Sequence, residues 1–346
     1  MTEVPGNPDP ADPLGLRHLA KLGDAVGSIC NNMIEQISRA IGITYNDLMI
    51  VVRARRQARA MSILAPVEAA ADAHRRIVLA RTDREIAVEA ALQDDALEER
   101  ARRRTAAAMS RQQENIEEVV VAAIEHVIEL GQKRTESPAP PAGKPADDWM
   151  AEFVDMCKNA SDTNMRQLWG RVLAGETQRP GSFSIRALFT LKVLRASEAE
   201  QFRVAANFVL QGDFIYRGSD NEALLRSGVT YSSLLTLASA GLLAPDPNAG
   251  WRIGEPSDRN VVITYEPYLL LFERGETSEP LDISTWPLTA VGKELARLIT
   301  VEHNWNYVKR LVAEVEPDGW RLASVLTPHG FPPPPDLPKG ELGSAG

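Results

Sequence analysis

The stretch that decides the fold is SDTNMRQLWGRVLAGE, residues 161–176. Its apolar residues recur at spacings of three and four, as on one face of an amphipathic helix: Leu168, Trp169, Val172 and Leu173. Ser161 and Asp162 precede this run and predict its N-cap, and Gly175 predicts a left-handed residue that ends the helix. The stretch therefore predicts a short helix anchored by Trp169.

Helical signals continue on both sides of this stretch. Residues 149–157 carry apolar side chains at helical intervals and predict a preceding helix. Pro180 and Gly181 stand where a type II turn requires them, and Ser184 predicts the cap of a third helix. The apolar residues of that third helix are Ile185, Leu188, Phe189 and Val193. Ser197 with Glu200 has the form of a capping box that opens a fourth helix.

These residues resemble a known family. The run 161–176, followed by PGSFS at 180–184, is similar to the core motif of an uncharacterised bacterial family, domain of unknown function 2806. The segments RQQENIE at 111–117 and LTAVGKEL at 288–295 are similar to its upstream and downstream segments, so the resemblance extends from Leu14 to about Val325. It implies the helical architecture and no activity.

The charged residues of the motif have two interpretations. They could be catalytic: Asp155, Asp162, Arg166, Arg171 and Glu176. Alternatively they form a cap and ion pairs that orient the helices around a buried Trp169. We favour the structural role and predict no catalytic residue.

Composition sets the broad class of the protein. The 346 residues are 44% hydrophobic and 25% charged, which is typical of a globular protein with two or three domains. The net charge of -9 disfavours a protein that coats nucleic acid or anionic lipid. Cys30 and Cys157 both fall on apolar helix faces and predict buried thiols in a reducing compartment. With no signal peptide and no run of eighteen apolar residues, we expect a bacterial cytoplasmic protein.

The N-terminal helix has an unusual number of glycines. Apolar residues at steps of three and four predict one amphipathic helix over residues 14–41. Gly23 and Gly27 form a small-xxx-small pair that predicts close packing against another helix, within the chain or in a dimer. The alternative is that this helix lies on a membrane surface as a peripheral contact.

An arginine cluster follows, made of Arg53, Arg55, Arg56 and Arg59. It opens an Ala-, Arg- and Glu-rich stretch to about residue 105, whose sparse apolar positions predict a projecting helix or loose coiled coil. The cluster is a candidate interaction site. Because no aromatic residue lies between the arginines to stack a base, we favour a solvated charged face over nucleic-acid binding.

After Leu210 the pattern becomes mixed. Short helices and strand-like runs predict a winged-helix-like α+β domain. Its expected recognition helix, residues 230–240, contains no Lys or Arg, so we expect protein binding or internal packing rather than DNA binding.

The predicted fold class is mainly α, with N-terminal amphipathic and long helices, a compact helical motif domain and a C-terminal winged-helix-like α+β domain. The predicted domains are a disordered tail at 1–13, a helical, coiled-coil-like region at 14–135, a Pro-rich linker at 136–147, the motif domain at 148–210, the winged-helix-like domain at 211–330 and a disordered tail at 331–346.

No pattern in the chain predicts an active site. A phosphate-binding loop, a nucleophile elbow and a zinc-binding His motif are all absent from the sequence, and the five histidines are dispersed. We therefore predict no cofactor and no metal. The expected function is a non-enzymatic interaction or regulatory protein that self-associates through its N-terminal helices and binds an unknown protein partner. A loose resemblance to membrane-perturbing abortive-infection proteins suggests phage defence, and the alternative is a nucleic-acid-binding regulator.

Overall fold

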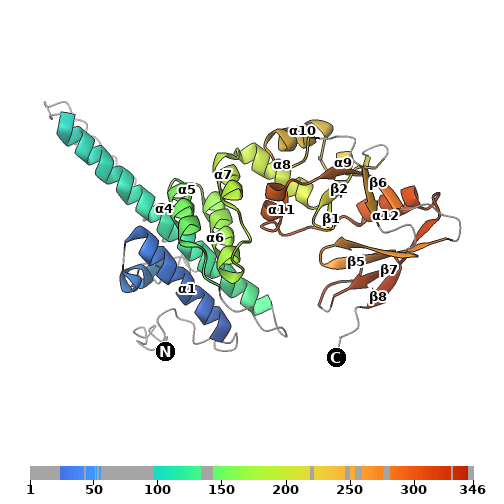
Figure 1. Ribbon diagram of the computed structural model, residues 1–346, viewed down its shortest axis with the longest axis horizontal. Coiled ribbons are helices and arrows are strands. Elements are labelled where there is room, and N and C mark those ends of the chain that lie inside the picture. The colour runs from blue at the N-terminus through green and yellow to red at the C-terminus, as the bar shows by residue number, and fades with distance from the viewer. Residues whose placement is uncertain are drawn as a thin grey trace, which may run out of the picture. The chain divides into compact units, whose positions relative to one another are not determined.

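The computed structural model describes residues 24–42, 44–50, 52, 54–55, 97–133, 143–218, 222–245, 250–253, 259–275, 281–328 and 330–341. The chain divides into two compact units, Met1–Ile185 and Arg186–Gly346 (Figure 1).

The N-terminal unit is built from helices. They are α1 (Asp24–Ile41), α4 (Leu97–Lys133), α5 (Asp147–Cys157) and α6 (Thr163–Gln178), with further helical residues at 45–50, 52 and 54–55. Helices α1, α5 and α6 all pack against α4 (Figure 1). The apolar stripe of α1 is buried in this packing at Ile29, Cys30, Met33, Ile34 and Ile37.

Helix α4 has two different halves. From Asn115 to Ile128 most of its side chains are buried in the unit, including Val119, Val120 and Ile124. From Glu99 to Glu114 nearly every side chain is exposed, and Figure 1 shows this part extending beyond α5 and α6. We call residues 97–114 the arm.

The C-terminal unit mixes helices and strands. In chain order it contains α7 (Ile185–Val193), α8 (Ala196–Ala206), β1 (Val209–Leu210), β2 (Phe214–Tyr216), α9 (Glu222–Arg226), α10 (Tyr231–Ser239), β3 (Gly250–Ile253), β4 (Asn260–Tyr265), β5 (Tyr268–Arg274), β6 (Leu281–Pro287), α11 (Ala290–Ala296), α12 (Trp305–Val315), β7 (Trp320–Thr327) and β8 (Lys339–Glu341).

The strands form two four-stranded sheets, ordered β1-β2-β6-β3 and β4-β5-β7-β8. Every pairing is antiparallel except that of β7 with β8, which is parallel. Gln211 has a positive φ of 55° and connects the sheets: its backbone N donates to Thr264 O at 2.8 Å, and its Nε2 donates to Val262 O at 2.8 Å.

The predicted fold class is wrong for the C-terminal part. Residues 211–330 do not form the single winged-helix-like domain that was predicted, because their strands belong to two sheets and β4 and β5 lie in the second, with β7 and β8. The predicted disorder of 331–346 also fails for the described residues up to 341, since Lys339–Glu341 form β8. The observed architecture is a helical N-terminal unit followed by a mixed unit with two sheets.

The helix caps predicted from the sequence were partly correct. The Asp162 cap is confirmed, and Thr230, Thr289 and Asn304 also cap the helices that follow them. The expected capping box at Ser197 is wrong, because α8 begins earlier and Glu198 Oε2 accepts from the backbone N of Arg195 at 2.9 Å instead.

The third helix, α7, buries a different face from the one that its pattern suggested. Ala187, Leu188 and Leu191 are buried, whereas three larger apolar side chains are 45%, 56% and 58% exposed: Ile185, Phe189 and Val193. The last two residues share a face with Ile185 at steps of four, so both faces of this short helix are apolar and periodicity alone could not choose between them.

Candidate functional site

The motif residues gather where α6 crosses α4. A Cβ at Gly170 would lie 2.8 Å from Ala122 Cβ and 2.8 Å from the backbone N of Ala123, so only glycine allows this approach. Trp169 is 2% exposed beside the crossing, and its ring meets Phe153 edge-on at 5.6 Å between centroids. The motif therefore holds two helix backbones in close contact.

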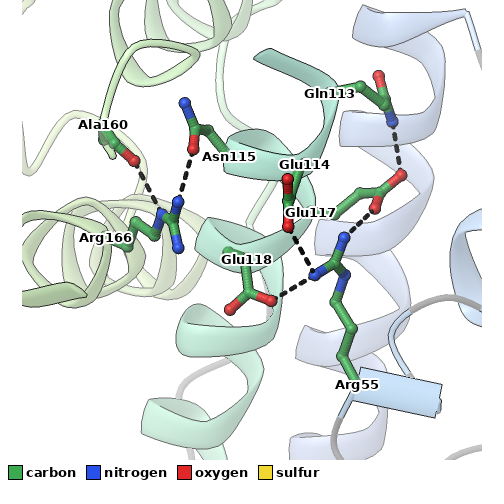
Figure 2. Close-up of polar contacts among 8 residues, drawn as sticks. All are labelled: Arg55, Gln113, Glu114, Asn115, Glu117, Glu118, Ala160 and Arg166. Atoms are coloured by element: carbon green, nitrogen blue, oxygen red, sulfur yellow. Dashed lines mark hydrogen bonds and ion pairs between the residues drawn. The ribbon is translucent and has the colours of Figure 1, made fainter. Parts of the chain in front are cut away.

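Asn115 joins α4 to the motif by two hydrogen bonds, and Figure 2 shows the one with Arg166. Its Nδ2 donates to Lys158 O at 2.8 Å, and its Oδ1 accepts from Arg166 Nη2 at 2.7 Å. Arg166 Nε also donates to Ala160 O at 2.9 Å. Because Asn115 is only 7% exposed, both of its polar ends need these partners. The arrangement fixes the loop between α5 and α6 on α4.

Asp162 has a local role at the start of α6. Its Oδ1 accepts from the backbone N of Asn164 at 3.0 Å and of Met165 at 3.1 Å. These are donors that the first helical turn leaves without intrahelical partners. Ser161 is exposed next to this cap. Asp162 and Arg166 therefore support the structural interpretation of the motif.

Glu176 is the buried acid of the motif, at 2% exposure. Its Oε1 accepts from Gly181 N at 2.6 Å and its Oε2 accepts from Phe183 N at 2.9 Å. Gly181 has a φ of +84°, and Ser182 N donates to Arg179 O at 3.2 Å, which confirms the predicted turn around Pro180. The carboxylate thus ties the turn back to α6.

Gly175 does not end α6, which continues to Gln178, so that prediction is wrong. A Cβ at Gly175 would lie 2.8 Å from Phe183 Cε2, so the glycine instead makes room for this ring. Trp149 Nε1 donates to Phe183 O at 2.7 Å and holds the same residue from α5. Ser184, the predicted cap, is exposed directly before α7.

Arg55 is the member of the arginine cluster that the structure describes. Its guanidinium lies among carboxylates of α4: Nη1 donates to Glu118, Nη2 donates to Glu117 at 2.8 Å, and Glu114 lies at 3.9 Å (Figure 2). Burial lowers the pKa of Arg55, but the hydrogen bonds to Glu117 and Glu118 outweigh it, so the pKa is raised overall. This residue attaches the helical residues 54–55 to α4.

Of the other predicted interaction residues, the structure describes only Gly27. Arg53, Arg56, Arg59 and Gly23 lie outside the described residues. A Cβ at Gly27 would meet nothing within 4 Å, so Gly27 does not permit a close helix contact within the unit.

A seam of small uncharged residues runs along the arm. Ala101, Thr105, Ala108 and Gln112 are spaced by four, three and four residues, and the same spacing continues into the buried part of α4 at Asn115, Val119 and Ala122. Alternation of three and four is the spacing of a coiled-coil contact face. We call Ala101, Thr105, Ala108 and Gln112 the arm seam.

The arginines of the arm lie beside the seam or opposite to it. At about 100° per residue, Arg103 falls on the opposite face and Arg100 and Arg104 fall on one flank. Glu99 pairs with Arg103 at 3.1 Å and with Arg102 at 3.6 Å, and all three side chains are exposed. Such exposed pairs contribute about 0–1 kcal/mol each, so they do not by themselves account for an extended helix.

Two residues with structural roles were missed from the sequence, because Asn115 and Gly170 meet their partners across helices that are distant in the chain. Glu176 was expected to have a structural role, but its partners are backbone amides of the turn that follows its own helix. The sequence did contain a signal for Asn115. It is polar, whereas the following positions of the same three-four repeat, Val119 and Ala122, are apolar.

Two further properties concern the described residues only. In the parts of the chain that the structure describes, His, Cys, Asp and Glu side chains form no group of three that could hold a metal ion. No described helix combines the length and apolar character needed to span a bilayer.

Residues 99–213 match the model of a family described as "Protein of unknown function (DUF2806)". The predicted resemblance to this family is therefore confirmed over those residues, which run from the arm through the motif to β1. No curated protein and no solved structure matches the chain.

Proposed function

We propose that this protein is a non-enzymatic interaction protein of the bacterial cytoplasm that self-associates through the arm seam. The observation that carries the proposal is the contact-like pattern of Ala101, Thr105, Ala108 and Gln112 on an exposed part of α4.

The exposure of the arm supports the proposal that a second copy of the chain binds it. An isolated helix of this length is marginal in water, because helix nucleation is costly and only packing of one face makes it stable. Met109 in the arm is 64% exposed, and Ala101 and Thr105 are exposed on the seam itself. A second copy that covers this face would supply the missing packing.

The side chains of the seam favour a close helix pair. Alanine and threonine are small, so two such faces can bring their backbones near to each other. The arm is basic near Arg100 and Arg104, whereas Glu117 and Glu118 are mostly buried in pairs with Arg55. A parallel pair would set the arginines of the two copies together, so an antiparallel pair is favoured.

The sequence predicted self-association through the N-terminal helices, including the amphipathic helix at residues 14–41, and we now propose it for the arm seam alone. The apolar stripe of α1, with Ile29 and Met33, is buried against the other helices of its own unit. In this fold that stripe is not available to a second copy or to a membrane. We therefore assign self-association to α4, and phage defence stays a prediction.

Sedimentation velocity of the full chain tests the proposal. The variant Ala101→Glu/Ala108→Glu places charges on the seam, and we expect it to be monomeric where the unaltered chain is a dimer or larger. Glu is a good helix former, so the arm itself should stay helical, as circular dichroism can verify.

The matched control is Ala106→Glu/Ala107→Glu, which adds the same two charges to exposed positions of the arm away from the seam. It should sediment like the unaltered chain. A monomeric unaltered chain, or equal loss of association in the seam variant and the control, would contradict the proposal.

A second candidate function is nucleic-acid binding by the arm. The exposed arginines flanking the seam favour it, since cations on one helix can neutralise successive phosphates. An electrophoretic mobility shift assay at low salt should then retard duplex or single-stranded DNA, and Arg100→Gln/Arg104→Gln should abolish the shift. Absence of any shift for the unaltered chain would remove this candidate.

A further inference from the structure

A cavity of about 610 Å³ opens in the C-terminal unit, and it is unrelated to the arm. Its wall is formed by α8 and the turn after it, by the start of α12, and by residues 335 and 336. A volume of this size is typical of sites for small ligands.

The first turn of α12 supplies hydrogen-bond donors to this cavity. Asn304 Oδ1 accepts from Tyr307 N at 3.2 Å and so caps one of the initial amides. The amides of Trp305 and Asn306 precede it in the same turn, where intrahelical acceptors do not exist, and both residues line the cavity. The positive end of an eleven-residue helix dipole lies at the same place.

A buried side chain supplies an independent donor. Asn207 lines the cavity and is only 9% exposed. Its Oδ1 accepts from Glu302 N at 2.8 Å, which fixes the orientation of the amide. Its Nδ2 donates no hydrogen bond to the described residues, so it is available to an acceptor on a bound molecule.

The charged and aromatic side chains that line the cavity indicate which chemical class of ligand it would bind. Lys309 reaches the cavity and pairs with Asp336 at 3.3 Å, an exposed carboxylate that a ligand anion can replace. The rings of His303 and Trp305 stack at 5.7 Å between centroids and provide a flat, partly apolar wall. Glu302 is the wall residue that would repel an anion.

We propose that this cavity binds the phosphate group of a small phosphorylated ligand that has a flat apolar part. Two backbone amides, an asparagine amide and an ammonium group suit phosphate, which offers three terminal oxygens, carries more negative charge than a carboxylate and is commonly bound at helix N-termini. The flat part of the ligand lies along the wall of His303 and Trp305.

Isothermal titration of the full chain with phenyl phosphate tests this site. We expect saturable binding of one molecule per chain, competition by inorganic phosphate, and no competition by benzyl alcohol, which has a similar ring without the phosphate. Lys309→Gln should weaken binding by about tenfold, because a charge-assisted hydrogen bond is lost.

Two other variants should raise the affinity for phenyl phosphate. Asp336→Asn frees Lys309 and keeps a residue type that tolerates the positive φ of 54°, and Glu302→Gln removes a like charge. Each should tighten phenyl phosphate binding by about two- to fivefold, the size of an exposed charge interaction. A simple loss of folding could not produce this gain.

Lys192→Gln is the matched control, because Lys192 is an exposed lysine of the same unit on α7, away from the cavity. It should bind like the unaltered chain. Absence of phenyl phosphate binding, equal affinity in Lys309→Gln and the control, or equally good binding of benzyl alcohol would each overturn the proposal.

Discussion

Asn115 lies at the point of α4 where the helix passes from exposed to buried surroundings. Its two partners, Lys158 and Arg166, are 43 and 51 residues away in the sequence. The local role of Asp162 was predictable because a cap acts within its own turn, but a hydrogen bond between distant helices leaves no local pattern. The resemblance to the family located the segment around Asn115 without indicating what this side chain does.

At the scale of residues, we predict that Asn115→Ala destabilises the N-terminal unit by roughly 1–3 kcal/mol, because it leaves Lys158 O and a guanidinium N–H of Arg166 buried without a partner. Urea unfolding followed by circular dichroism measures the change. Asn164→Ala, at an exposed position of α6, is the control and should change the free energy of unfolding by less than about 0.5 kcal/mol. Equal effects of the two substitutions would argue against a role for the buried amide.

At the scale of elements, the contact between α4 and α6 depends on the absence of a side chain at Gly170. A Cβ there would meet backbone atoms of α4, which cannot rotate away. Gly27 is the opposite case, because it lies within α1 and a Cβ there would meet nothing within 4 Å. The sequence alone presented both residues as glycines inside helices, and only the neighbouring helix distinguishes them.

We therefore predict opposite effects of the same substitution. Gly170→Ala should destabilise the unit by roughly 1–3 kcal/mol through overpacking, and Gly27→Ala should stabilise it by up to about 1 kcal/mol through better helix propensity. Thermal unfolding of the two variants and the unaltered chain compares them. A Gly170→Ala variant as stable as the unaltered chain would show that the helices can separate at little cost.

Short strands limited what the sequence could predict after Leu210. The two-residue β1 and the three-residue β8 are too short to show alternation, and β6 was not recognised although its buried positions alternate at Leu281, Ile283 and Thr285. Without these strands, the pattern of short helices and strand-like runs resembled one winged-helix-like domain instead of a unit with two sheets.

At the scale of the whole molecule, both units contain buried groups that resist deprotonation in alkali: burial raises the pKa of the Cys157 thiol in the N-terminal unit, and two tyrosines are affected in the C-terminal unit. Burial raises the pKa of Tyr265 to about 12, although the hydrogen bond from Asn304 N acts in the opposite direction. Burial also raises the pKa of Tyr307 well above its usual value, and its hydroxyl donates to Phe208 O at 2.8 Å. Both tyrosines belong to the C-terminal unit.

We predict that the C-terminal unit loses stability as the pH rises. In the unfolded chain a tyrosine loses its proton near pH 10, whereas in the folded unit Tyr265 keeps it to about pH 12. This contribution to stability is fully present below about pH 10 and is lost as the pH rises toward 12. Hydrogen exchange at increasing pH, corrected for the intrinsic rate, should show loss of protection in β2 and α12 over this range, with a weaker pH dependence in a Tyr265→Phe variant. Equal pH dependence in the variant and the unaltered chain would contradict the prediction.

The continuity of α4 determines how an event at the arm would reach the rest of the unit. At about 1.5 Å per residue, its 37 residues form a rod of about 55 Å without a break between the seam and the Asn115 contact. A partner that binds the outer end therefore binds a rigid helix and not a flexible linker. Any rotation or tilt of the arm would also move α4 where it crosses α6 at Gly170, and the packing there has no space for even one methyl group.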